Sequence, residues 1–200
     1  MVSLLKINFH TLKQSTMSVN FPVCPNGCAF QLPELDQDIC TPNVSFGEIT
    51  HIYIAAGDAA SLTDVEDLAE WTARLSDTSV DPDAIRTMLV SADLPAASAE
   101  EIVISLNRKV YSPADHVINV DVDDISESMY DFGRATSCNV GYKIWFGTPD
   151  WIFGGTEGID AMLNLRPQIE RGYKSVHKLV GTITWSAKFS PERHTSPFAS

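Results

Sequence analysis

The sequence lacks any long apolar run, and this absence argues against a membrane-spanning segment. No segment approaches the roughly 18–20 consecutive apolar residues of a membrane span. Near the first residue, Val2–Leu5 is the longest apolar stretch, far shorter than the core of a signal peptide. We therefore expect no membrane partner and no secretory leader, with Met17 as an alternative start.

Basic residues are also scarce, at 14 Lys and Arg against 26 Asp and Glu, which gives a net charge of -12. Proteins that hold nucleic acid need basic surface to neutralise phosphates, so this balance argues against adhesion to nucleic acid. An acidic surface repels DNA, which can be useful where a polyanion must slide past without sticking. Acidic residues gather in 58–83 and 121–131, whereas 166–193 is locally basic. The two regions could pair copies head to tail, or both could be solvated faces.

Cysteines are few, and their spacing leaves three interpretations open. Cys24 and Cys28 form a C-P-N-G-C cluster, and Cys40 and Cys138 lie further along the chain. The cluster resembles half a zinc site that would need a distant cysteine or histidine. A disulfide such as Cys24–Cys28 is the second interpretation, and free thiols in a reducing compartment are the third. We favour free thiols, and we predict no metal and no cofactor.

Common catalytic motifs are missing as well. The histidines show no i, i+4 pair, and no H-E-x-x-H, G-x-S-x-G or phosphate-binding lysine loop occurs. Asp121 and Asp123 could bind a hard cation from one strand face, and Glu127 with Asp131 could form a carboxylate pair. A solvated face explains both pairs, and a loop bend explains the glycine-rich residues 154–158. The sequence therefore predicts that the chain is not an enzyme.

The pattern predicts an α+β fold, mainly antiparallel β, as a barrel or sandwich with flanking helices. Residues 1–45 are punctuated by four prolines and one glycine and are expected to be an extended arm. Residues 46–190 would form a single β-rich domain with a long loop at 76–100, and 191–200 a C-terminal tail.

Individual elements follow from apolar spacing. A strand is predicted near 49–55, and a helix follows a capping box at Thr63 and Glu66, with Leu68 on its buried stripe. Strands at 102–106 and 118–122 are predicted to form an antiparallel hairpin. A helix capped by Ser126 comes next, and further strands are predicted at 140–148, 159–165 and 175–189. Tryptophans at strand spacing, Trp145, Trp151 and Trp185, fit a core better than a stacking surface for sugars or bases.

Longer stretches carry a more specific likeness. NRKVYSPADHVINVDVDDISESMYDFGR (107–134), YKIWF (142–146) and LVGTITWSAKFSPERHTSPF (179–198) resemble virion structural proteins of tailed phages that infect Bacteroidota, including crAss-like phages. CPNGCAF, IYIA and LAEWTARL, earlier in the chain, are similar to the same group.

This resemblance implies a tail-tube-like fold whose subunits form hexameric rings, or another homo-oligomer, that stack through loops and terminal arms. It implies a virion protein that is assembled in the host cytoplasm, contacts other virion proteins and encloses an acidic lumen for DNA passage. It brings no catalytic residue. A head-decoration, neck or connector protein, or a tube protein of a secretion system, is the alternative. The residues that we predict at subunit interfaces are Trp185, Phe189, Arg193, Phe198, Arg171 and Lys174.

Overall fold

The structure is a computed structural model that describes residues 47–79, 81–105, 108–138, 141–169, 171 and 176–198. These residues all belong to one compact unit, Val44–Ser200. The predicted arm at 1–45, with Cys24, Cys28 and Cys40, lies outside the described residues, and so does Lys174.

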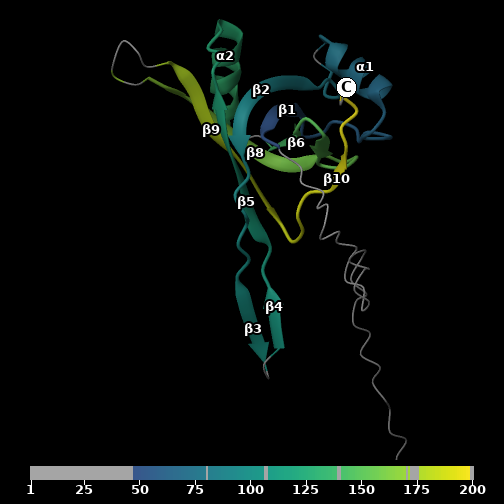
Figure 1. The fold of residues 1–200 in the computed structure, drawn as a ribbon, viewed down its shortest axis with the longest axis vertical. Coiled ribbons are helices and arrows are strands. Elements are labelled where there is room, and N and C mark those ends of the chain that lie inside the picture. The colour runs from purple at the N-terminus through teal and green to yellow at the C-terminus, as the bar shows by residue number, and fades with distance from the viewer. Residues whose placement is uncertain are drawn as a thin grey trace, which may run out of the picture. The chain divides into compact units, whose positions relative to one another are not determined.

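Strands predominate in the described chain, with two short α-helices and one turn of 3₁₀ helix (Figure 1). The strands are β1 (Ile49–Ala56), β2 (Arg86–Asp93), β3 (Glu101–Ser105), β4 (Arg108–Tyr111), β5 (Ala114–Val122), β6 (Gly141–Gly147), β7 (Trp151–Phe153), β8 (Ile159–Gln168), β9 (Lys178–Ala187) and β10 (Arg193–Thr195). The helices are α1 (Leu68–Ser76), α2 (Glu127–Ala135) and the 3₁₀ turn η1 (Thr136–Cys138).

Six strands close into an antiparallel barrel in the order β1-β2-β5-β9-β8-β6, and β6 pairs back to β1. Strands β7 and β10 continue the sheet from β6, outside the ring. The longest ladder joins β5 to β9, from Ala114 opposite Ala187 to Val122 opposite Leu179. The predicted mainly antiparallel fold is therefore confirmed, in the form of a closed barrel.

Alternation along β5 and β8 places one apolar row of each strand inside the barrel. In β5 the even-numbered residues from Ala114 to Val122 are buried, and the odd-numbered residues between them face outward. In β8, Ala161, Leu163 and Leu165 are buried in the same way. Because a period of two places one apolar row on one face, each strand has a single register that fills the barrel.

Two hydrophobic cores lie on opposite sides of β6. Ile144 and Phe146 point into the barrel, where they join Ile52, Ile118 and other apolar residues. Trp145, between them in sequence, points the other way into a second core to which α1 contributes Trp71. Trp145 therefore lies on the face of β6 opposite to Ile144 and Phe146. Trp185 belongs to the barrel core, at 8% exposure.

Helix α1 begins later than the capping box predicts. Its N-cap is Asp67, whose side chain accepts from the Ala69 amide, and the residues before it form turns. The Glu70 carboxylate accepts from the Thr63 amide (2.9 Å), so Thr63 is held from within the helix instead of capping it. Leu68, predicted on the buried stripe, is 50% exposed, and Trp71 is the fully buried residue. The predicted start and stripe are therefore wrong.

Helix α2 agrees with its prediction. Ser126 is the N-cap and accepts from the Met129 amide (3.4 Å). Gly133 faces Leu165 of β8 and Leu179 of β9, and Thr136 is also buried. This packing places α2 against the barrel.

Two other predictions are wrong. The interval 76–100, predicted as a long loop, contains β2. Its alternation was hidden because Leu89 is 67% exposed beside the buried Met88, so apolar residues occupy both faces. The strand at 101–105 pairs with β4 and not with the strand ending at Val122, which instead pairs with β2 and β9.

The C-terminal residues are part of the domain and not a separate tail. Strand β10 pairs with β7, from Arg193 opposite Phe153 to Thr195 opposite Trp151. The Ser196 amide then donates to the Asp150 carbonyl (2.9 Å). Phe198 packs on the second core, with its ring 5.3 Å from that of Tyr53. The predicted tail boundary at 191 is therefore wrong for residues 193–198.

Candidate assembly surface

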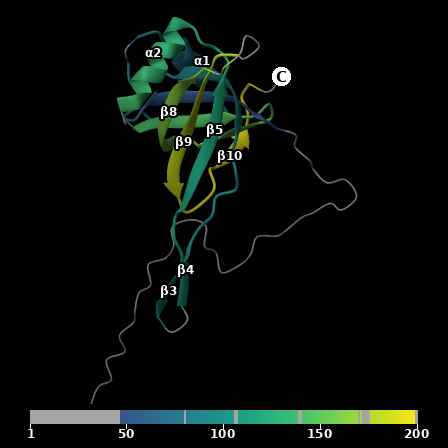
Figure 2. The ribbon, with the colours of Figure 1, turned by 90° about the vertical axis from the view of Figure 1, so that its left-hand side faces the viewer.

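One long hairpin interrupts the barrel between β2 and β5. At its base, β2 pairs with β5 from Ser91 opposite Asp121 to Asp93 opposite Asn119. Pairing resumes in the same register where the Ser112 amide donates to the Glu100 carbonyl (2.9 Å), and it continues through β3 and β4. Figures 1 and 2 show the β3–β4 pair beyond the end of the barrel strands. The described parts of 86–122 therefore form one hairpin with a gap in its middle.

The gap arises because only one of its two arms keeps a strand partner among the described residues. Residues 114–118 stay paired with β9 on one side. The opposite arm, 94–99, contains Pro95, which has no amide hydrogen and cannot continue a ladder. Within the described chain, no backbone hydrogen bond joins 94–99 to 114–118. One edge of β5 is consequently unpaired over the five residues Ala114–Ile118.

The hairpin beyond the gap carries large apolar side chains in solvent. Ile102, Val103, Ile104, Val110 and Tyr111 are between 43% and 64% exposed. They occupy both faces, since Ile102 is opposite Val110 while Val103 is opposite Lys109. The Lys109 ammonium forms an ion pair with the Glu101 carboxylate across the hairpin (2.8 Å). A two-stranded hairpin is at best marginally stable in water, so this one needs a surface to pack on.

A groove of about 400 Å³ lies at the gap. Its walls are the arm 94–99 and the turn 188–191, and Ala114, His116 and Phe153 line it between them. Ala96, Ala97 and Ala99 of the arm are exposed and contribute apolar methyl groups to this wall. His116 is 6% exposed, and its Nε2 has no hydrogen-bond partner among the described residues.

The predicted interface residues are distributed over several places. Trp185 is buried and stacks on His116, so it supports the groove from inside. Phe189 lines the groove and is 54% exposed, with the Lys188 ammonium 5.4 Å from its ring. Arg193 is exposed, and its guanidinium lies 4.2 Å from the Trp151 ring.

Two further candidates lie elsewhere. Phe198 covers the second core, and Arg171 is exposed before the start of β9, whereas the groove adjoins the end of that strand. The sequence reasoning placed Trp185 and Phe189 together but missed the apolar residues of the hairpin. The exposure of these hairpin residues could not be predicted from the sequence, because the same alternating pattern fits a strand that is buried on one face.

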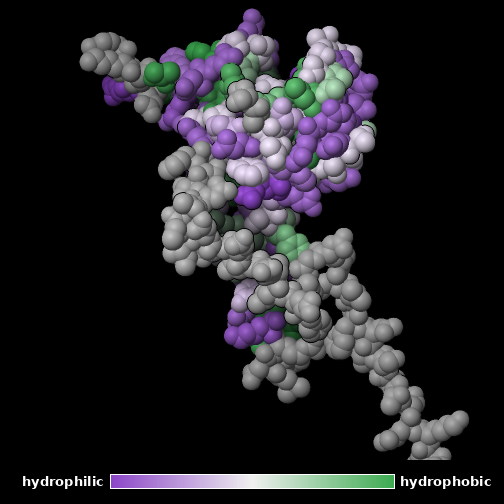
Figure 3. Space-filling view, turned by 45° about the vertical axis from the view of Figure 1, so that its right-hand side comes forward, coloured by the Kyte–Doolittle hydropathy of each residue, from purple (hydrophilic) through white to green (hydrophobic). Residues whose placement is uncertain are grey.

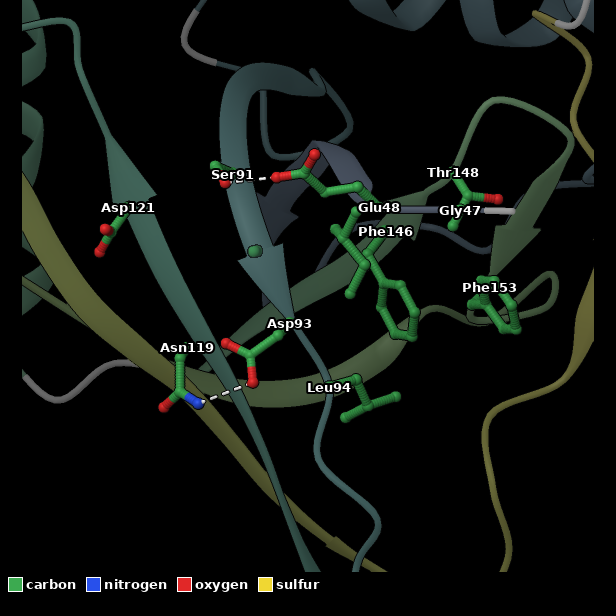
Figure 4. A pocket seen from close by; sticks show the side chains of 12 residues that line it. Gly47, Glu48, Ser91, Asp93, Leu94, Asn119, Asp121, Phe146, Thr148 and Phe153 are labelled. Carbon is green, nitrogen blue, oxygen red and sulfur yellow. Dashed lines mark hydrogen bonds between the residues drawn. The ribbon is translucent and has the colours of Figure 1, made fainter. Parts of the chain in front are cut away.

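A pocket of about 620 Å³ is lined on one wall by polar side chains (Figure 4). There the Ser91 hydroxyl donates to Glu48, and the Asn119 amide donates to Asp93 (3.2 Å). Phe146 and Phe153 form part of the apolar wall. The Glu48 and Asp93 carboxylates therefore each accept a hydrogen bond from a residue of a barrel strand. We assign this pocket no catalytic or binding role.

Metal and phosphate chemistry find little support in the described residues. No group of three or more His, Cys, Asp or Glu side chains there could hold a metal ion. Asp121 forms an ion pair with Lys178 across the sheet (2.6 Å), and Asp123 is exposed. Cys138 is exposed and free. The helices of the described chain also lack the length and apolar character of a membrane span.

The glycine-rich residues 154–158 form the turn from β7 to β8, as the loop-bend interpretation predicts. Gly154, Gly155 and Gly158 all have positive φ, which L side chains rarely adopt. The Trp145 indole donates to the Gly155 carbonyl (2.8 Å), and a Cβ on Gly158 would meet the Trp145 ring at 2.8 Å. The glycines therefore let the turn close over Trp145.

Charge on the outer surface is mainly negative around α1. Asp58, Asp64, Glu66, Asp67 and Asp81 are all exposed. A hydrogen bond from Ser79 to the Asp77 carboxylate lowers the pKa of Asp77, so this carboxylate stays ionised to lower pH. Figure 3 shows one face of the molecule, on which hydrophilic purple and neutral white predominate and hydrophobic green lies in scattered patches.

Comparison with protein-family models, with curated proteins and with solved structures finds no match to this chain. Any functional conclusion therefore depends on the geometry above and on the likeness of the sequence stretches already quoted.

Proposed function

We propose that this chain is a structural subunit of a tailed-phage virion that assembles with copies of itself into tail-tube rings. The observation that carries the proposal is the long apolar hairpin on a closed barrel. Exposed apolar side chains on both faces of an isolated hairpin are typical of a segment that becomes buried on association.

Closure of the barrel restricts how copies can meet. A closed sheet offers no edges along its ring, so subunits cannot simply extend one another's sheets there. Open backbone remains on the hairpin and on Ala114–Ile118 of β5, both at the same end of the domain. Association through this end agrees with a ring subunit whose projecting loops bind its neighbours.

The acidic charge fits the same role. A net charge of -12 disfavours tight contact with DNA, and a lumen lined by carboxylates would let DNA pass without adhering. The exposed carboxylates around α1 are candidates for such a surface. In this proposal DNA passes through the lumen without being bound. The binding partners are copies of the chain and other virion proteins.

The proposal is tested by the assembly state of the purified full chain. Sedimentation velocity at rising concentration and negative-stain images should show rings or stacked tubes with a central channel. Ile104→Lys should abolish them, whereas Leu89→Lys, which charges an equally exposed apolar residue on β2, should not. A chain that stays monomeric throughout would overturn the proposal, and assembly unaffected by Ile104→Lys would remove its main support.

A further inference from the structure

We infer that the groove at the gap of the long hairpin receives the β3–β4 hairpin of a second copy of this chain. The inference rests on the proposed function, because it names the two surfaces through which copies associate. The donor surface is Ile102, Val103 and Ile104 of β3. The acceptor surface is the arm 94–99, the start of β5 and the turn 188–191.

The two surfaces match in length and in backbone requirements. Strand β3 has five residues and pairs with β4 along one side only. The unpaired edge of β5, Ala114–Ile118, is also five residues long. A strand of a partner laid along this edge would supply the missing ladder, as in β-strand addition. Ala114 and His116, from the inward face of β5, line the groove beside this edge.

The charge balance of the two surfaces favours a second copy of the chain as the occupant of the groove. Across 94–118 and 185–191, the acidic side chains Glu100, Glu101 and Asp115 are balanced by the basic side chains Arg108, Lys109 and Lys188. The excess negative charge of the chain therefore lies elsewhere. Like charges repel when two copies approach, so the neutral surfaces are where contact costs least.

The hairpin of a given copy cannot fill its own groove. Strand β4 ends at Tyr111 and β5 begins at Ala114, so only two residues join the hairpin to the groove. The hairpin must therefore reach a different copy, whose hairpin reaches a third. Such a heterologous contact closes into a ring or continues as a filament, according to the rotation between neighbours.

Complementation between two blocked variants tests this contact. Ile104→Lys blocks the donor and leaves the groove intact, whereas Ala97→Lys blocks the groove and leaves the hairpin intact. Both residues are exposed, so each substitution should leave the fold of the monomer unchanged, which circular dichroism and thermal melting would verify. Ala73→Lys, on the exposed face of α1, is the matched control for Ala97→Lys.

We expect each blocked variant to associate with itself at least about tenfold more weakly than the parent chain. Their mixture should form one-to-one heterodimers that grow no further, because a single intact donor and a single intact groove remain. Ala73→Lys should assemble like the parent chain.

Other outcomes separate the two proposals. If Ala97→Lys assembles normally while Ile104→Lys does not, the hairpin binds elsewhere, so the inference fails and the proposed function stands. A mixture that stays monomeric also overturns the inference. If the parent chain never associates, the proposed function itself fails.

Discussion

The imidazole of His116 lies flat against the indole of Trp185, with ring centroids 5.0 Å apart and planes inclined by 5°. The two residues are opposite each other in the β5–β9 ladder, so the stack is a cross-strand pair inside the barrel. His116 lines the groove at the gap, and Trp185 supports it from the core. The shape of the groove therefore depends on the packing of the barrel.

Replacing Trp185 by Ala should lower the free energy of unfolding by roughly 3–5 kcal/mol, because it empties a large buried site. Urea unfolding of dilute monomer would measure the loss, and Trp185→Phe should recover part of it. If stability barely changes while assembly fails, Trp185 acts at an interface between subunits and not in the core of the monomer.

Phe198→Ala should destabilise the monomer by about 2 kcal/mol, because Phe198 is half-buried and packs on Tyr53 and Trp71. Phe189→Ala is the matched control, since the Phe189 side chain is 54% exposed and should change stability by less than about 0.5 kcal/mol. Thermal melting of both variants would compare them. Equal effects would show that residues near 198 do behave as a tail.

Much of the fold could be predicted from the sequence where alternation was regular. Strands β5, β6 and β8 and the cap of α2 follow from side-chain period and capping chemistry alone. Strand β2 could not be found this way, because Met88 faces the core and Leu89 faces solvent while both are apolar. Tertiary packing decides such faces, and local sequence does not.

The candidate surface was harder to predict for a related reason. Ile102 and Ile104 alternate as a buried strand would, so the pattern predicts burial, yet nothing in the described chain covers them. Their partner strand was also mistaken, because β4 lies between β3 and β5 in the sequence and is the strand that pairs with β3. A sequence states which residues are apolar, but only the topology shows which of them remain uncovered.

Gly133→Ala should stabilise the chain by about 1 kcal/mol. Gly133 lies inside α2, where alanine has the higher helix propensity, and an added Cβ would sit 3.7 Å from Leu165 Cβ, an ordinary contact. Gly181→Ala is the opposing control, because its Cβ would lie 2.0 Å from the Asn164 carbonyl oxygen and force β8 and β9 apart. Urea unfolding would compare the two, and a loss of stability in Gly133→Ala would contradict the packing of α2 on the barrel.

Alkaline pH should destabilise the chain through Tyr53. Burial raises the pKa of the Tyr53 hydroxyl from 10.0 to about 12, because the folded protein disfavours the phenolate. Between these values the unfolded chain has released the proton and the folded chain still holds it, so stability falls as pH rises. One pKa unit corresponds to about 1.4 kcal/mol, so the loss across this window is about 2–3 kcal/mol.

Tyr53→Phe removes the titrating group while keeping the ring that stacks on Phe198. This variant should match the parent chain near pH 8 and lose less stability between pH 10 and 12. Urea unfolding at fixed pH values would measure the difference, and absorbance of the phenolate would report the titration directly. Parallel pH profiles for the two proteins would mean that the hydroxyl reaches solvent, and the second core would then be more open around Tyr53 than its 5% exposure indicates.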